Sequence, residues 1–366
     1  MSDGLTVRDR KRKLHGLILT SALLLVALAA PTAGFAAGDL YTVSVVLDPE
    51  DPDARNNAYR DGLNLVLIRV TGSEDEQHLA ELSEMFAVPK NYVLRFRPGA
   101  DNTLEVSFDG DAIERVLHQY RKTIWGDDRP LTLVWLAVDW GQGEREIVGA
   151  DDAQQSEDAT RSIDRNRLLR ERIEDTAERR GIPMVFPLLD IEDLQKISFS
   201  DIWGGFDEQL VEASRRYNAS SILVGRIRPD SQQQSRWTYY FGEEQISFLG
   251  EPEAVAGLVA DQLAAKFAIP GGSVLENYQL LVDGIDSVVA YGRVQQLIGD
   301  LAVVENFVLR WVSGHKVEFS VSIYGGIERL NKALELSGLL YPAAEPDDFR
   351  EGPVSGSYRL HFVYLP

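Results

Sequence analysis

Two kinds of hydrophobic pattern alternate along this chain, and their order is the feature that most limits how it can fold. Near the amino terminus, runs with an apolar residue at every second position, typical of half-buried strands, alternate with runs of helical spacing. The predicted elements are, in order, a strand at 41–47, helices at 54–70 and 79–86, strands at 92–96 and 103–108, and a helix at 110–120. This order predicts a small βαββα domain over residues 38–126.

The same order recurs near the carboxyl terminus. The predicted elements there are a strand at 278–283, a helix at 287–298, strands at 303–312 and 317–323, a helix at 327–336 and a strand at 358–365. Two strands joined by the short turn Ser313-Gly314 form a hairpin in the middle of this series. A β-α-β-β-α-β order is that of ferredoxin-like folds, so we expect such a domain over residues 277–366.

Residues 127–270 follow a different pattern. The segment 131–138 is almost continuously apolar, which is typical of a strand that is buried on both faces of a sheet. The acidic stretch 139–164 is predicted to be a mobile loop. The remaining predicted elements are a helix at 165–180, a short strand at 183–187, a helix at 209–217, strands at 221–227, 237–241 and 244–249, and a helix at 253–267. We therefore expect an α+β protein, with a central α/β layered domain flanked by small βαββα-type, ferredoxin-like domains.

The first 37 residues have the three zones of a secretory signal peptide. Five of the six residues at positions 8–13 are basic, an apolar stretch of 14 residues runs from Leu17 to Ala30, and small residues around Ala36 offer a cleavage site. A membrane-spanning helix needs about 20 apolar residues, so we expect cleavage and a periplasmic protein with no membrane span. The alternative is an uncleaved inner-membrane anchor, whose basic flank would still place the rest of the chain outside the cytoplasm.

Composition excludes several classes of partner. The formal net charge is −20, and residues 1–37 hold five basic and two acidic side chains, so the remainder carries −23. Nucleic acids and anionic lipids are bound by clustered Lys and Arg, and no such cluster follows the leader. The chain has no cysteine, which excludes disulfides, thiol catalysis and a lipid-acceptor cysteine.

Patterns for catalysis or metal binding are sparse. No two of the histidines beyond the leader have the spacing of metal ligands, so we expect neither a metal nor a cofactor. Ser313 and Lys316 have the S-x-x-K spacing, but they lie in a predicted hairpin turn where they would not share a helix face. Asp190 and Asp193 would suit an acid and a base, yet close carboxylate pairs are expected among 57 acidic residues.

The best binding candidates lie near predicted strand ends or turns of the middle region. Sheets of α/β domains commonly place ligand crevices there, and Trp and Arg are frequent anchors of protein interfaces. A structural role is the alternative, with Trp237 in the core and Arg129 paired to Asp190 inside the protein. The candidates are Trp125, Arg129, Asp190, Trp203, Arg215, Arg216, Arg226 and Trp237.

Six short phrases between residues 40 and 270 carry a resemblance to a known family. They are Arg69-Val-Thr-Gly72, Arg129-Pro130, Arg180-Gly-Ile-Pro183, Pro187-Leu-Leu-Asp190, Ala213-Ser-Arg-Arg-Tyr217 and Val224-Gly-Arg226. Together they resemble the proteobacterial domain-of-unknown-function family 2066 (DUF2066). The resemblance implies no activity, because none is assigned to that family.

Three hypotheses about function follow. Export, several small domains and the missing catalytic motifs favour a non-catalytic binding or envelope-assembly accessory protein with an envelope protein partner. The second hypothesis is a periplasmic hydrolase whose active site is assembled from distant positions. The third is a sensor that binds a small ligand or glycan through its tryptophans.

Overall fold

The protein has an α+β fold, as predicted. The computed structural model describes residues 40–126, 129–150, 160–229, 231, 233–301, 303–343 and 359–365. The predicted signal peptide and its cleavage site lie outside these residues. The described residues form three sheets, each with its own buried side chains.

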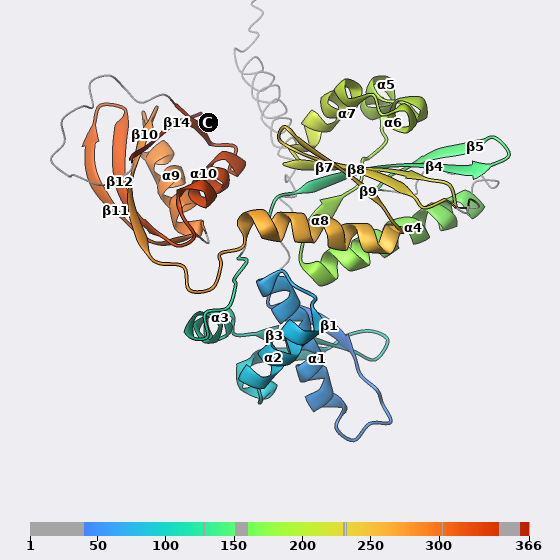
Figure 1. Ribbon diagram of the computed structural model, residues 1–366, viewed down its shortest axis with the longest axis horizontal. Coiled ribbons are helices and arrows are strands. Elements are labelled where there is room, and N and C mark those ends of the chain that lie inside the picture. The colour runs from blue at the N-terminus through green and yellow to red at the C-terminus, as the bar shows by residue number, and fades with distance from the viewer. Residues whose placement is uncertain are drawn as a thin grey trace, which may run out of the picture. The chain divides into compact units, whose positions relative to one another are not determined.

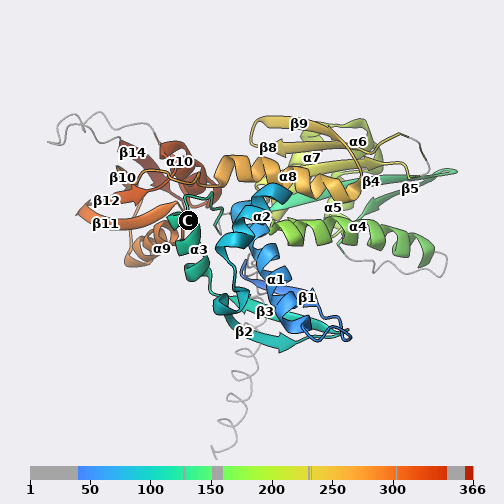
Figure 2. The ribbon, with the colours of Figure 1, turned by 60° about the horizontal axis from the view of Figure 1, so that its bottom comes forward.

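The first sheet has three antiparallel strands in the order β1-β3-β2 (Figure 2). Alternate residues of β1 and β3 are buried against α1, which confirms the period-two pattern of the sequence. Asp75 and Asp109 cap α2 and α3 by accepting backbone N–H bonds. The elements are β1 (Thr42–Val46), α1 (Ala54–Thr71), α2 (Glu76–Met85), the 3-10 turn η1 (Pro89–Tyr92), β2 (Val93–Pro98), β3 (Thr103–Phe108) and α3 (Gly110–Gln119).

Helix α1 ends where the sequence predicts. Gly72 follows it with a φ of 71°, and its N–H bonds the carbonyl oxygen of Ile68. A Cβ at this position would lie 2.7 Å from Ala264 and 3.0 Å from Trp125. Glycine is therefore needed here both for the backbone conformation and for close packing.

The second sheet has the strand order β5-β4-β7-β8-β9, with the short β6 paired to the start of β4. Strands β4 and β7 are parallel, and the other neighbours along that order are antiparallel. The strands are β4 (Thr132–Gly141), β5 (Glu144–Val148), β6 (Met184–Val185), β7 (Ser221–Ile227), β8 (Arg236–Phe241) and β9 (Glu244–Leu249). The helices are α4 (Thr160–Arg180), α5 (Ile191–Lys196), α6 (Phe199–Gly204), α7 (Asp207–Ser214) and α8 (Pro252–Phe267), and the 3-10 turn η3 (Arg215–Tyr217) follows α7.

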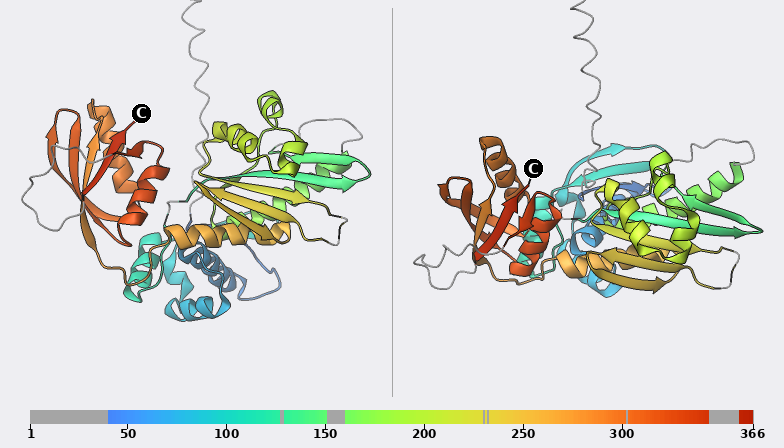
Figure 3. Two further views of the ribbon diagram at one scale, coloured as in Figure 1. Left: turned by 45° about the horizontal axis from the view of Figure 1, so that its top comes forward. Right: turned by 90° about the horizontal axis from the view of Figure 1, so that it is seen from above.

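Helices cover both faces of this second sheet (Figures 1 and 3). Helices α4 and α8 lie on one face, and α5, α6 and α7 lie on the other. Residues of β4 alternate between the two cores, with Val134 and Leu136 in the first and Leu133 and Trp135 in the second. All four side chains are fully buried, which confirms the prediction of a strand buried on both faces.

The predicted loop at 139–164 is wrong over much of its length. Strand β4 continues to Gly141, a tight turn with Gln142 and Gly143 at positive φ follows, and β5 pairs back along β4. Strand β5 is a sheet edge, where charged side chains are common, and its Glu144 and Arg145 are exposed. Residues 151–159 of the predicted loop lie outside the described residues. Helix α4 also begins inside the predicted loop, at Thr160.

The strands of the third sheet come from the predicted βαββαβ series, with one additional strand. The strand order of this sheet is β11-β12-β10-β14-β13. The additional strand β13 follows α10 and takes the sheet edge, and β14 lies between β13 and β10, parallel to β10. The elements are β10 (Glu276–Asp283), α9 (Val288–Asp300), β11 (Val304–Ser313), β12 (Lys316–Ile323), α10 (Ile327–Leu336), β13 (Leu340–Pro342) and β14 (Arg359–Tyr364).

None of the helices in the described part of the chain combines the length and the apolar character that crossing a bilayer requires.

Candidate functional site

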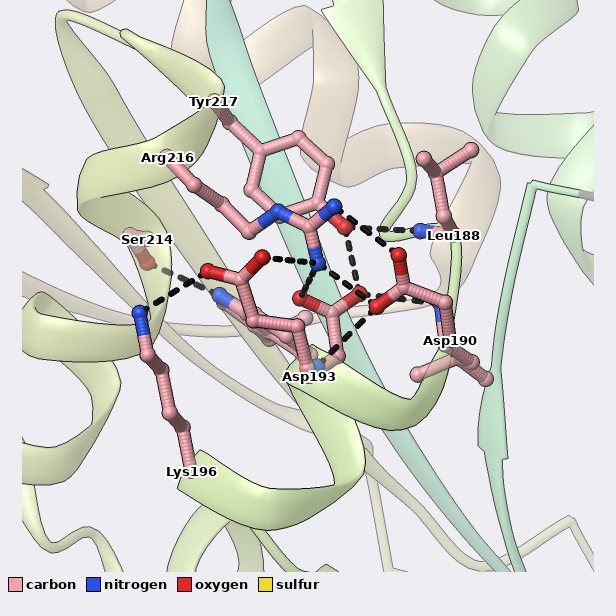
Figure 4. Close-up of polar contacts among 10 residues, drawn as sticks. Leu188, Asp190, Asp193, Lys196, Ser214, Arg216 and Tyr217 are labelled. Atoms are coloured by element: carbon pink, nitrogen blue, oxygen red, sulfur yellow. Dashed lines mark hydrogen bonds and ion pairs between the residues drawn. The ribbon is translucent and has the colours of Figure 1, made fainter.

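The short helix α5 begins within a network of charged side chains (Figure 4). The Asp190 carboxylate caps α5 by accepting the backbone N–H of Asp193 at 3.1 Å. Arg216, from the turn after α7, donates to both oxygens of Asp190, at 2.6 and 2.9 Å. The same guanidinium donates to Asp193 at 3.1 Å. Planar two-point pairing of this kind is the strongest geometry for an arginine and a carboxylate.

Asp193 is the centre of this network and its side chain is fully buried. The hydroxyl of Tyr217 donates to it at 2.5 Å, and the backbone N–H of Leu189 donates to the same oxygen at 2.9 Å. The Tyr217 oxygen in turn accepts the N–H of Leu188 at 2.8 Å. Both oxygens of the buried carboxylate thus have donors, which offsets the cost of its desolvation.

The backbone before α5 adopts an uncommon conformation. Leu189 has a φ of 53°, in the left-handed region that non-glycine residues rarely occupy. Its N–H points at Asp193, so the hydrogen bond to the buried carboxylate holds the chain in this conformation. The network therefore fixes the turn between β6 and α5.

The electrostatics of the network keep its groups in one protonation state. The Arg216 guanidinium, together with the backbone N–H of Asp193, lowers the pKa of Asp190 to about 2. Burial and the neighbouring Asp193 raise the pKa of Tyr217, while the bond to Asp190 raises the pKa of Arg216. At neutral pH Asp190 is ionised and Tyr217 and Arg216 are protonated, so none of the three is poised to transfer a proton.

Large apolar side chains are exposed on and beside α5 and α7, which lie next to this network in the chain. Ile191 of α5 is 76% exposed and Phe206, just before α7, is 53% exposed. Such side chains are scattered singly on most surfaces, whereas an apolar patch on neighbouring elements indicates a contact surface, and α5 and α7 contact each other. We call the following set the α5–α7 surface: Leu188, Ile191, Leu194, Phe206 and Val211.

A second polar group lies where the parallel strands β4 and β7 end. Asp139 is buried at the end of β4, and Arg228, just beyond β7, donates to it at 2.9 Å. The guanidinium of Arg228 also lies over the ring of Trp203, 5.3 Å from its centroid, and Trp203 stacks on Phe199 at 5.2 Å. Arg228 lowers the pKa of Asp139, so this pair is ionic at neutral pH.

The predicted site residues fall into separate groups in the structure. Asp190 and Arg216 are brought together, whereas Arg215 is exposed and pairs with Glu212. Arg226 donates to the carbonyl oxygen of Ile202 at 2.7 Å, next to Trp203. Burial lowers the pKa of Arg226.

The other three predicted residues lie inside the protein. Trp125 and Trp237 are each 1% exposed, in the core covered by α4 and α8. Arg129 stacks on Trp125 with 3.9 Å between its guanidinium and the ring centroid. The Arg129 guanidinium donates to backbone carbonyl oxygens, among them those of Arg69 and Gly181. Asp190 instead pairs with Arg216. The suggested ion pair between Arg129 and Asp190 is therefore wrong.

Sequence reasoning missed several members of both groups. Asp193 was considered only as half of a carboxylate pair, and Tyr217, Asp139 and Arg228 were not singled out. The phrase Pro187-Leu-Leu-Asp190 followed by Asp193 carries a local signal, because an aspartate three residues before another polar residue is typical of a helix start. Its partner Arg216 lies 26 residues away, and no local pattern connects them. Within the described residues, no group of three His, Cys, Asp or Glu side chains is arranged to hold a metal ion.

Comparison with known proteins gives one match. Residues 35–126 match the model of a family described as Domain of unknown function (DUF8605). The resemblance to DUF2066 is therefore wrong. Several of the phrases that suggested DUF2066 contain a glycine with a structural role. Gly72 ends α1, Gly181 follows α4, and Gly225 allows Trp237 to pack on β7. No curated protein and no solved structure matches the chain.

Proposed function

We propose that the chain is a non-catalytic binding protein and that the α5–α7 surface is where a partner protein docks. The observation that carries this proposal is a set of exposed apolar side chains on and beside α5 and α7, two helices that contact each other, of which α5 is fixed at its start by the Asp190–Arg216 network. Apolar side chains on a preformed surface favour association because little conformational entropy is lost on binding.

Charge favours a different protein as the partner over a second copy of this chain. Residues 190–217 contain seven acidic and three basic side chains. Two copies of this surface face to face would bring like charges together, which disfavours self-association. A partner with an apolar patch and a basic rim would complement it.

The arrangement of the network supports binding over hydrolysis. Paired carboxylates act as acid and base only when one of them holds a proton near the working pH. Asp190 has a pKa near 2 and is held by Arg216, so it would serve neither as an acid nor as a free base. Burial of Trp125 and Trp237 likewise counts against a sensor that uses them to contact a ligand.

We further propose that the protein works in the periplasm. The support for this is the order of basic, apolar and small residues in positions 1–37. Alkaline phosphatase becomes active only outside the cytoplasm. If the chain is exported, alkaline phosphatase fused to its carboxyl terminus should therefore be active. Deleting residues 2–37 should abolish that activity, and an equally active deletion fusion would contradict export.

Site-specific photocrosslinking tests the docking surface. A photoreactive phenylalanine analogue is placed at Ile191 or Phe206 in the full chain, and cross-linked products are identified from intact cells. We expect the same partner protein from both positions. The matched control is Val288, an apolar residue at the start of α9 that is 85% exposed and distant in sequence from the α5–α7 surface.

The proposal requires that a charge on the surface reduces the amount of cross-linked product. Leu194→Glu should reduce cross-linking from position 206 at least about ten-fold, the effect of about 1.4 kcal/mol of lost binding energy. Equal products from position 288, or an undiminished product in the Leu194→Glu protein, would exclude this surface. A product that contains two copies of the chain would show self-association instead.

A further inference from the structure

An open groove lies in the region of the first sheet, and none of its lining residues belongs to the α5–α7 surface. Its volume is about 670 Å³, within the usual range of ligand sites. It lies between the beginning of α1, the turn η1 and strand β2. Its lining residues are Leu47, Pro52, Ala54, Arg55, Asn56, Tyr59, Lys90 and Phe96.

The groove combines an aromatic wall with positive charge. Phe96 of β2 is 45% exposed and its ring lies 5.9 Å from the buried ring of Tyr59. The Arg55 guanidinium lies over the Phe96 ring, 5.1 Å from its centroid. Lys90 completes the lining, and none of the lining residues is acidic. The lining residues include two cations and no carboxylate, and although Asp51 and Asp53 flank Pro52 in the chain, the lining itself favours a negatively charged ligand.

Strand β2 forms one side of this groove and is an edge strand. Among the described strands it pairs only with β3 (Figure 2). Residues Leu94 to Pro98 of β2 are all exposed. Exposed strand edges pair with extended peptides through their backbone groups. Leu94, 68% exposed, adds a further apolar side chain to this edge.

Positive charge continues onto the other face of the same strand. Arg95 and Arg97 alternate with Phe96 along β2, and a smaller hollow is lined by these three residues with Glu105 and Ser107. Arg97 pairs with Glu105, and Arg95 donates to Ser107. An extended segment lying along β2 would therefore meet basic side chains on both of its faces.

We propose that this groove binds an extended acidic segment of another protein, which adds to β2 as a further strand. An apolar side chain of the segment packs on Phe96, and a carboxylate pairs with Arg55 and Lys90. This site is independent of the α5–α7 surface, so either proposal can fail while the other holds.

Fluorescence anisotropy with a labelled synthetic peptide tests this site. The probe repeats Glu-Glu-Val-Val, so that each face of the extended peptide carries both acidic and apolar side chains. We expect the purified full chain to bind it, and the affinity to fall as salt is raised. The corresponding Lys-Lys-Val-Val peptide should not bind.

Variants assign binding to the groove. Arg55→Glu and Lys90→Glu should each weaken binding about ten-fold, and Phe96→Ala should weaken it by a similar factor. Arg115→Glu on α3 is the matched control, since it makes the same charge change at an exposed position outside the groove lining. Circular dichroism spectra confirm that each variant is folded.

Two further probes decide how the segment binds. An acidic peptide with N-methyl groups along one edge cannot pair with a strand, so its binding should be lost. Unchanged binding of the methylated peptide would overturn strand addition. Full displacement of the acidic peptide by free glutamate at equal concentration, or equal weakening by Arg115→Glu, would overturn the proposed site.

Discussion

Single carboxylates in this protein have different roles because of their burial and their donors. Asp193 is fully buried and accepts hydrogen bonds from Arg216, Tyr217 and the backbone N–H of Leu189, so it organises the turn before α5. Asp190 is partly exposed and shares the same guanidinium while also capping the helix. The lowered pKa of Asp190 makes its contribution measurable.

The acid sensitivity of the fold should depend on Asp190. Its pKa falls from 3.8 to about 2 in the folded protein, so its ionised form stabilises the fold above pH 4 and this contribution is lost as the pH falls from about 4 to about 2. Asp190→Asn keeps an oxygen for the helix cap but removes the charge. The stability difference between the two proteins, measured by urea unfolding, should therefore shrink over this pH range.

The matched control for this pH dependence is Glu212→Gln. Glu212 pairs with Arg215 on the surface, where both side chains are largely exposed. Exposed pairs of this kind contribute little to stability. A difference for Asp190→Asn that stays constant between pH 4 and pH 2 would show that Asp190 is not held by Arg216 in solution.

Elements with a long, regular pattern could be predicted from the sequence. Strand β7 has the predicted bounds, and α1 differs from the prediction by one residue at its end. Helices α5 and α6 were missed because six residues carry too little periodicity, and both begin at side-chain caps, Asp190 and Ser198. The three-residue strand β13 has no pattern of its own and forms because β14 offers it a paired edge.

The candidate site shows the same limit. Asp190 and Arg216 were both singled out, but their pairing depends on how α5 and η3 pack, which local patterns do not report. Trp237 is of a residue type that is common in binding sites, yet it lies in the core covered by α4 and α8 and donates its indole N–H to the carbonyl oxygen of Gly250. Residue type alone does not distinguish an anchor in an interface from one in a core.

Strand β7 depends on glycine for its packing against Trp237. A Cβ on Gly225 would lie 2.3 Å from the Trp237 ring and 2.6 Å from Leu136, both of which are buried and unable to move freely. Gly225→Ala should therefore destabilise the protein by about 1–3 kcal/mol in urea unfolding. Gly250→Ala is the control because nothing lies within 4 Å of its Cβ. Equal stability of the two variants would contradict the packing of Trp237 on β7.

At the scale of the whole molecule, buried arginines connect segments that are far apart in the sequence. Arg69 at the end of α1 donates to the carbonyl oxygen of Glu178 in α4. Arg180 at the end of α4 donates to the carbonyl oxygen of Gly72 and pairs with Asp261 of α8. Arg129 bonds the carbonyls of both Arg69 and Arg180. Guanidinium groups suit this role, since five donors in one plane can satisfy several carbonyls at once.

These bonds should make the first and second sheets unfold together. Arg180 is 2% exposed, and Arg180→Met would leave the carbonyl oxygen of Gly72 and the carboxylate of Asp261 without this donor. In scanning calorimetry the unaltered protein should then show one transition for both sheets, and the variant two, with a calorimetric enthalpy above the van't Hoff value. Arg179→Met is the control, because the Arg179 side chain is 47% exposed and, among the described residues, pairs only with Glu74. Two transitions in the unaltered protein would mean that the arginines do not couple the two sheets.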